Sequence, residues 1–219
     1  MSPTSLDLLV VGATGRTGRH VVTQAMERGH RVRALARSVR ADALPAGAVA
    51  LPGSVLDPEL VRDAVHGVDA IVVALSMVRS NPNNPWSRIT TPPDLHPKAA
   101  SLLTSAAAPT TRYVSLSAHG VGTSSARAGW MFMGLVHASN IGVAYRALAR
   151  AEAVIARSEL PWTVVRPTRL TNGPGRGLWR FPEERLGSRA SIDRRDVAAA
   201  LIRLAEGRDH LRRAVSLTG

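Results

Sequence analysis

Residues 6–22 have the sequence LDLLVVGATGRTGRHVV, in which a strand-like segment, three closely spaced glycines and a helix-like segment follow one another. Leu6 to Val11 is apolar except for Asp7 and has the length of a strand, and it ends at a glycine-rich turn. From Arg16 to Arg28 the apolar residues then recur at helical spacing, and Gly29 is placed to end that helix. A buried strand followed directly by an amphipathic helix predicts the first half of a strand–helix–strand unit.

The turn between this strand and helix has the glycine spacing that a dinucleotide pyrophosphate requires. Gly12 allows the sharp turn, Gly15 lets the backbone approach a phosphate, and Gly18 lets the helix pack close to the strand. The free N–H groups and the positive dipole end of the helix then attract the phosphates. A glycine triplet alone also suits a plain turn, but the strand and helix around it favour the nucleotide interpretation. We expect phosphate contacts from Gly12, Ala13, Thr14, Gly15, Arg16, Thr17 and Gly18.

The rest of the chain alternates strand-like and helix-like segments. This alternation predicts an α/β fold of the Rossmann type, a doubly wound parallel sheet with helices on both faces. Further strands are expected at 31–36, 49–51, 69–75, 112–117, 162–166 and 214–217, and helices at 57–66, 98–108, 140–158 and 194–206. Irregular segments at about 77–97, 118–139 and 168–190 are expected to cover a substrate. Since no clear linker interrupts the pattern, residues 1–219 are expected to form a single domain.

Composition restricts the possible classes of protein. Of the 219 residues 45% are hydrophobic, which is enough for a sizeable core. The absence of cysteine excludes disulfides, zinc–thiolate sites and thiol catalysis, and we expect no metal site. Apolar stretches such as residues 70–75 are too short to span a membrane, and the N-terminus lacks the basic segment of a signal peptide. A cytoplasmic protein without a membrane partner is therefore expected.

The charge is strongly positive, with a formal net value of +12 in which Lys98 is the only lysine. Such a protein attracts anions in general, including nucleotides and phosphorylated substrates. The basic residues are scattered, no DNA-reading motif is present and aromatic residues make up only 4%, so a nucleic-acid partner is not expected. Monomer and homodimer both remain open.

The end of the second strand bears on the choice between NAD and NADP. An NAD site usually has an acidic residue there, which accepts hydrogen bonds from the ribose hydroxyls. This chain instead has Arg37 and Ser38, which can bind a 2′-phosphate, and Arg16 is expected to point toward the same region. Both arginines also suit a plain surface position in an arginine-rich chain. We predict a preference for NADP(H).

These motifs resemble the atypical short-chain dehydrogenase/reductase group, which includes NmrA-like NAD(P)H-binding proteins and the biliverdin and flavin reductases. The resemblance runs almost from end to end and rests on residues 12–18, 37–38, 53–57, 114–118, 160–167 and 192–198. It implies that Ser54 and Val55 lie against adenine, although the group more often has Asp at the first of these positions. It further implies a ribose site at Ala74, Leu75 and Ser76, and a nicotinamide site at Ser117, Pro167 and Thr168.

Typical short-chain dehydrogenases use a Tyr-x-x-x-Lys pair, in which the lysine lowers the pKa of the tyrosine. In this chain Tyr145 is followed by Ala149 where the lysine belongs. The usual carbonyl-reducing mechanism is therefore not expected. Ser117, His119 and Tyr145 remain the catalytic candidates, each of which also suits an ordinary packing or backbone-bonding role.

Two functions fit these observations. The first is an NADPH-dependent oxidoreductase that passes hydride to a small conjugated acceptor such as a flavin, a quinone or a biliverdin-like molecule, whose anionic groups the arginines can bind. The second is a non-catalytic NADP(H) sensor of the NmrA-like type.

Overall fold

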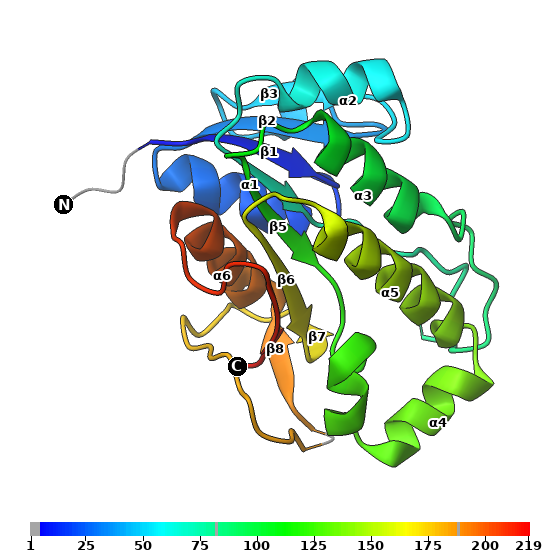
Figure 1. Cartoon of the computed structure of the whole chain (residues 1–219). Helices are drawn as coiled ribbons and strands as arrows, with labels where there is room; N and C mark the ends of the chain where they lie inside the picture. Colours follow the sequence, from blue (N-terminus) through cyan, green and yellow to red (C-terminus); the bar gives the residue numbers. More distant parts are fainter. Residues whose placement is uncertain (1–4, 82, 188) are drawn as a thin grey trace.

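The computed structural model describes residues 5–81, 83–187 and 189–219, and its strands form a seven-stranded, wholly parallel sheet (Figure 1). The sheet order is β3-β2-β1-β4-β5-β6-β9. The bounds are β1 Asp7–Val11, β2 Arg31–Ala36, β3 Val49–Pro52, β4 Ala70–Val73, β5 Arg112–Leu116, β6 Trp162–Pro167 and β9 Arg213–Leu217. Residues 1–4, 82 and 188, which belong to the expected N-terminal segment and to two of the expected irregular segments, lie outside the described residues.

The strand order reverses direction at the middle of the sheet. From β1 the chain proceeds outward to β2 and β3, and it then returns to pair β4 with the other side of β1. In the register, Leu8 lies opposite Val32 of β2 on one side and Ala70 of β4 on the other. In open α/β sheets, ligands bind at such a reversal, outside the carboxyl ends of the strands.

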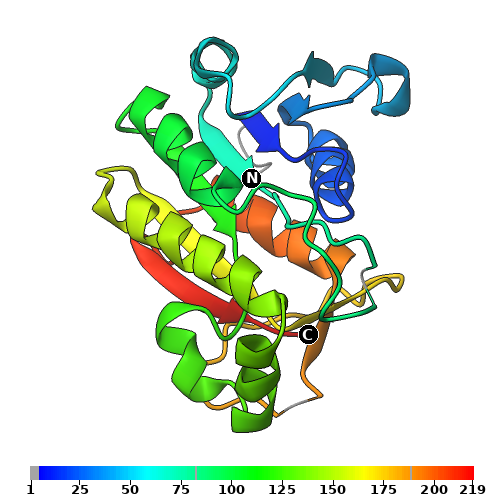
Figure 2. The same ribbon diagram turned by 90° about the vertical axis from the view of Figure 1, so that its right-hand side faces the viewer.

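Helices cover both faces of the sheet, as Figures 1 and 2 show. Alternate residues of β1 serve the two faces: Leu8 and Val10 belong to one buried cluster, Leu9 and Val11 to the other. The first cluster is completed by α1 Gly18–Glu27 and α6 Arg194–Glu206, and the second by α2 Pro58–Val65, α3 Leu95–Ala106 and α5 Ile141–Arg157. The expected doubly wound, Rossmann-type architecture is confirmed.

The structure corrects three expectations. Helix α3 begins at Leu95 rather than at Lys98, because Pro97 lies in the first turn, where a missing N–H costs no helical hydrogen bond. Segment 118–139, expected to be irregular, contains the 3₁₀ helix η2 Gly122–Arg127 and helix α4 Trp130–Ala138. Segment 168–190 contains β7 Arg169–Thr171, which pairs in parallel with β8 Ser191–Asp193. A further 3₁₀ turn, η1, covers Ala41–Ala43.

Candidate nucleotide and substrate site

The glycine turn joins β1 to α1 at the centre of the carboxyl edge of the sheet. Gly12 has a φ of +82°, and its carbonyl oxygen accepts a hydrogen bond of 2.9 Å from the Gly15 N–H. A Cβ atom on Gly18 would lie 2.1 Å from that same carbonyl oxygen, and one on Gly12 would lie 2.8 Å from the Ala74 oxygen. The backbone is therefore packed so closely that side chains are excluded at both positions, and we call this turn, residues 12–18, the cradle.

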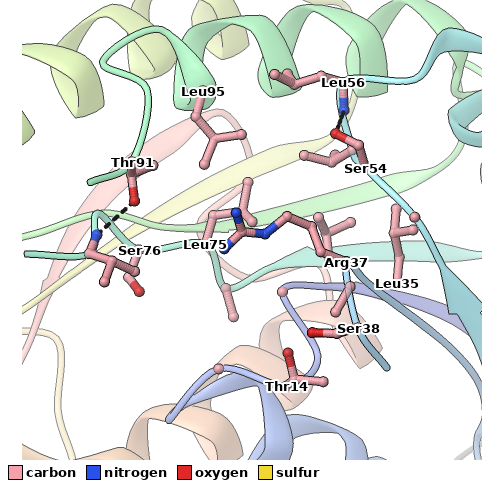
Figure 3. Close-up of a pocket in the computed structure, with 18 of the residues that line it drawn as sticks. Thr14, Leu35, Arg37, Ser38, Ser54, Leu56, Leu75, Ser76, Thr91 and Leu95 are labelled. Atoms are coloured by element: carbon pink, nitrogen blue, oxygen red, sulfur yellow. Dashed lines mark hydrogen bonds between the residues drawn. The ribbon is translucent and has the colours of Figure 1, made fainter. Parts of the chain in front are cut away.

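A first cavity of about 320 Å³ lies beside this turn, at the carboxyl ends of β1, β2 and β4 (Figure 3). Its wall brings together most of the residues predicted to hold the dinucleotide: Gly12, Thr14, Gly15, Arg37, Ser38, Ser54, Val55, Ala74, Leu75 and Ser76. The wall also includes residues that were not predicted individually as cofactor contacts, namely Leu35, Leu56, Val78, Thr91, Pro92 and Leu95. Thr91 is fixed there because its Oγ1 accepts a hydrogen bond of 2.9 Å from the Val78 N–H.

Arg37 dominates the electrostatics of the first cavity. Its exposed side chain extends from the end of β2 across the cavity toward Leu75, with Ser38 beside it (Figure 3). None of the described residues that line the cavity is acidic. The Ser54 hydroxyl accepts a hydrogen bond of 3.1 Å from the Leu56 N–H, so this serine shapes the turn that precedes α2. The cavity thus offers a guanidinium and hydroxyls to an anionic ligand.

Four of the predicted phosphate-binding residues lie outside the wall of the first cavity. Ala13, Thr17 and Gly18 are buried behind the turn. Arg16 is exposed, and its charge acts on Arg194 at the start of α6, whose pKa is lowered first by burial and then by Arg16. The structure therefore does not place Arg16 in the wall that holds Arg37.

A second cavity, of about 260 Å³, lies at the carboxyl ends of β5 and β6. It brings together the three catalytic candidates Ser117, His119 and Tyr145, and it also includes Pro167 and Thr168. The rest of its wall is largely apolar and comes from the start of α4 and from the chain around β7: Ala118, Ala128, Gly129, Phe132, Arg169, Leu170, Leu186, Gly187 and Ala190. Of the three segments expected to cover a substrate, 118–139 and 168–190 contribute to this wall, whereas 77–97 contributes to the wall of the first cavity instead.

Tyr145 and His119 are linked, but neither carries a charge at neutral pH. The Tyr145 hydroxyl donates a hydrogen bond of 2.9 Å to the backbone oxygen of His119, and burial raises the pKa of Tyr145 to about 12. Nδ1 of His119 lies 3.1 Å from Oγ of Ser216, while Nε2 is buried with no hydrogen-bond partner among the described residues. Burial lowers the pKa of His119 against a smaller opposing effect of the Arg127 backbone. A tyrosinate base is therefore not available.

Ser117 belongs to a buried network for which the sequence carries no signal. Its hydroxyl donates a hydrogen bond of 2.6 Å to Oε1 of Glu152 on α5. Arg166 on β6 binds both oxygens of the same carboxylate, with Nε 3.0 Å from Oε1 and Nη2 2.5 Å from Oε2. The Arg166 and Glu152 side chains are 4% and 12% exposed. Glu152 lies seven residues after Tyr145 and so shares its helix face, but no spacing indicates that Arg166 joins it.

Neither a membrane-spanning helix nor a metal-binding cluster is found among the residues that the structure describes. No helix there is both long enough and apolar enough to cross a membrane. The same residues include no group of three histidine, aspartate or glutamate side chains placed to hold a metal ion.

Solved structures of similar fold cover nearly the whole chain. The anaerobilin reductase ChuY of Escherichia coli O157:H7 is 21% identical, with a TM-score of 0.74 over 96% of each chain. A candidate NADH-flavin reductase of Streptococcus pneumoniae is 22% identical, with a TM-score of 0.71 over 98% of this chain and 99% of the other. A candidate NAD-dependent epimerase/dehydratase of Bacillus halodurans is 20% identical, with a TM-score of 0.76 over 98% and 94%. At these identities the likeness establishes the fold.

Curated relatives match a shorter part of the chain. A stretch of 69 residues is 41% identical to the photosystem II assembly factor Ycf39 of Synechocystis and 38% identical to that of Trieres chinensis. The match covers 31% of this chain and 21% or 22% of those proteins, so the chain spans about a fifth of the length of the curated relatives that it matches.

A family model covers far more of the chain. The model described as NAD(P)H-binding matches residues 12–207, from the first glycine of the turn to the residue that follows α6. The match includes every residue that lines the first cavity except Val11, and all the residues that line the second. With the cradle and the two cavities in place, this match shows that the chain belongs to the NAD(P)H-binding protein family.

Proposed function

We propose that the protein is a single-domain, NADPH-dependent oxidoreductase that transfers hydride to a small conjugated acceptor such as a flavin, a quinone or a biliverdin-like molecule. The observation that carries this proposal is the second cavity, which lies at the end of β5, next to the strand whose end lines the first cavity. A dinucleotide held at the glycine turn would extend across the ends of β4 and β5 toward it. The nicotinamide end of that dinucleotide would use only the side of the cavity formed by Ser117, Pro167 and Thr168, and the mostly apolar remainder of the wall favours an acceptor beside it.

The residues present fit an NADP(H) molecule. The cradle that Gly12 and Gly18 keep free of side chains would take the pyrophosphate, and Ser54 and Val55 would lie against adenine. Residues 74–76 would line the ribose. Ser117, Pro167 and Thr168 would contact the nicotinamide. When bound, the cofactor supplies the hydride, and the chain positions the acceptor and excludes water.

The preference for NADP(H) over NAD(H) is assigned to Arg37. The Arg37 guanidinium and the Ser38 hydroxyl can bind a 2′-phosphate. Among the described residues of the cavity wall there is no acidic side chain that could accept a hydrogen bond from an unmodified ribose hydroxyl. We expect the wild-type protein to bind NADPH more tightly than NADH. Arg37→Ala should weaken NADPH binding about tenfold or more, the loss expected for a hydrogen bond to a charged group, and change NADH binding little.

Arg40→Ala is the matched control for this test. Arg40 is equally exposed on the same segment, but it pairs with Asp42 at 2.5 Å and does not line the cavity. Its removal should leave both dissociation constants unchanged. A wild-type protein that binds NADH as tightly as NADPH would contradict the assignment.

The second cavity favours a planar acceptor without a dedicated proton donor. Its wall is mostly apolar, and Arg169 gives it one positive group suited to an anionic substituent. The reaction would consume one NADPH and one proton per acceptor reduced by two electrons. Since the Tyr145 hydroxyl is already bonded to the His119 oxygen and Ala149 replaces the usual lysine, solvent would supply the proton.

The test is a steady-state screen of NADPH oxidation with FMN, FAD, quinones and biliverdin, each compared with a protein-free control. At least one acceptor should accelerate NADPH consumption. The missing Tyr-Lys pair favours a second candidate, the NADP(H) sensor. Tight NADPH binding together with no acceleration by any acceptor would select that candidate.

A further inference from the structure

The hydroxyl of Ser117 is held in one orientation from behind the second cavity. Ser117 lines that cavity and is 9% exposed, and it also lines the small space in which Glu152 lies. Its Oγ is 2.6 Å from Oε1 of Glu152. A serine hydroxyl has one proton and two acceptor positions. If the proton goes to Glu152, only lone pairs remain for a ligand in the second cavity.

Glu152 is kept as an acceptor by its ion pair with Arg166. The guanidinium binds both carboxylate oxygens, and an arginine in a protein stays charged. Arg166 is enclosed in turn: its Nη1 donates 2.9 Å to Oγ1 of Thr123, and a Cβ on Gly122 would lie 2.6 Å from its Nη2. A carboxylate fixed in this way has no proton to give, so the shared proton must come from Ser117.

We infer that Ser117 is a hydrogen-bond acceptor that selects a ligand N–H group in the second cavity, and that Glu152 and Arg166 are positioning residues that impose this polarity. The inference rests on the proposed function and narrows it. Ser117 then binds the N–H group of the ligand and orients the ligand, and it is not the acid that protonates the acceptor. Two ligand groups supply the required chemistry, the carboxamide N–H₂ of the nicotinamide and a ring N–H of the acceptor.

Binding experiments with matched ligand pairs test the inference and separate the two sources. The first arm compares NADP⁺ with its 3-acetylpyridine analogue, which keeps the carbonyl but lacks the N–H₂. The second arm compares lumiflavin with 3-methyllumiflavin, which lacks the ring N–H, using protein saturated with NADP⁺. In at least one arm the wild-type protein should prefer the N–H ligand by about tenfold, the value of one hydrogen bond in a buried site. The arm that shows the preference identifies the group.

Three variants connect the preference to the network. Ser117→Ala removes the acceptor and should reduce the preference to within about twofold. Glu152→Gln should also reduce the preference to within about twofold, although Ser117 is still present. A glutamine amide can donate a hydrogen bond to the serine oxygen, and the serine proton then points toward the cavity. Thr123→Val is the matched control, since it touches Arg166 without touching Ser117, and it should keep the preference.

The inference is overturned if the wild-type protein shows no preference in either arm, or if Ser117→Ala keeps it. Should Glu152→Gln fail to fold with Arg166 left unpaired, the double variant Glu152→Gln/Arg166→Met removes both charges together and is expected to lose the preference as well. Because the readout is binding, a protein that shows the preference but reduces no acceptor disproves the proposed function alone.

Discussion

Among the glycines of the turn, Gly18 leaves the least room for a side chain. A methyl group there would lie 2.1 Å from the Gly12 carbonyl oxygen, a backbone atom that cannot move without opening the turn. We expect Gly18→Ala to weaken NADPH binding about tenfold or more and to lower the melting temperature, since overpacking against backbone costs about 1–3 kcal/mol. Titration of NADPH against protein fluorescence, with a thermal melt, measures both.

Gly134→Ala is the matched control for Gly18→Ala. Gly134 lies in α4, and a Cβ there would meet nothing within 4 Å. The replacement should leave NADPH binding unchanged and the helix equally or slightly more stable. If Gly18→Ala bound NADPH as tightly as Gly134→Ala, the close packing of the turn would not matter for the cofactor.

Single-residue predictions from the sequence succeed where the signal is local. A glycine turn and the end of a strand predict the positions of Gly12, Arg37 and Ser38, and in the structure all three line one cavity. Glu152 and Arg166 could not be found in this way. They lie 35 and 49 residues from Ser117, on a helix and another strand, and only the folded sheet brings them together.

At the level of helices and strands, prediction depended on how a segment is buried. The strands of the central sheet are covered on both faces, so they appear in the sequence as short apolar runs and their positions were predicted to within a few residues. Helix α4 was missed because its sequence WMFMGLVHA is apolar on almost every side and shows no helical periodicity. Strand β7 was missed because it has only three residues and pairs with β8, about twenty positions later.

The start of α2 gives a test of the local rules that fix these elements. The Asp57 side chain accepts hydrogen bonds from the N–H groups of Glu59 and Leu60, at 3.0 and 3.3 Å. Asp57→Ala should therefore reduce the free energy of unfolding by about 1 kcal/mol, which urea denaturation can measure. Asp63→Ala, an exposed position within the same helix, should cost nothing. Equal effects of the two changes would show that the cap does not stabilise α2.

For the whole molecule, the buried histidine of α3 predicts how stability depends on pH. His96 lies between the sheet and α5, with Glu152 in the wall of the same small space. Burial lowers its pKa from the ordinary 6.5, and the Leu75 backbone opposes this in part. The unfolded chain then binds a proton more readily than the folded chain. The contribution of His96 to the free energy of unfolding is therefore fully present above about pH 6.5 and is lost as the pH falls below that value.

His96→Leu should flatten this dependence. The free energy of unfolding, measured by urea denaturation at about pH 7.5 and about pH 5.5, should decrease less in the variant than in the wild-type protein. His119, whose pKa burial also lowers, retains part of the effect. A variant that loses as much stability on acidification as the wild-type protein would mean that His96 takes up its proton equally well in both states.

The two cavities lie next to each other at one edge of the sheet, and this arrangement is the reason why we propose a reductase rather than a protein that only binds a dinucleotide. The first cavity lies where the strand order reverses, between β1 and β4. The second cavity lies beside it, and its wall comes from the chain between β5 and β8. The sequence predicted both regions, because parallel strands place their carboxyl ends at one edge. It could not predict the shape of the second wall, which α4 and the chain around β7 form through long-range contacts.

A substitution that fills the second cavity tests whether the acceptor binds there. Ala190 lines that cavity and not the first, so Ala190→Trp should block the acceptor while it leaves the contacts of the first cavity with the adenosine end of the dinucleotide intact. We predict that the wild-type protein accelerates NADPH oxidation by a flavin, a quinone or biliverdin. The variant should lose about tenfold or more of that rate while its NADPH dissociation constant stays within about twofold. A variant that oxidises NADPH at the wild-type rate would show that the acceptor does not bind in the second cavity, and a wild-type protein that binds NADPH and reduces no acceptor would disprove the proposed reductase activity.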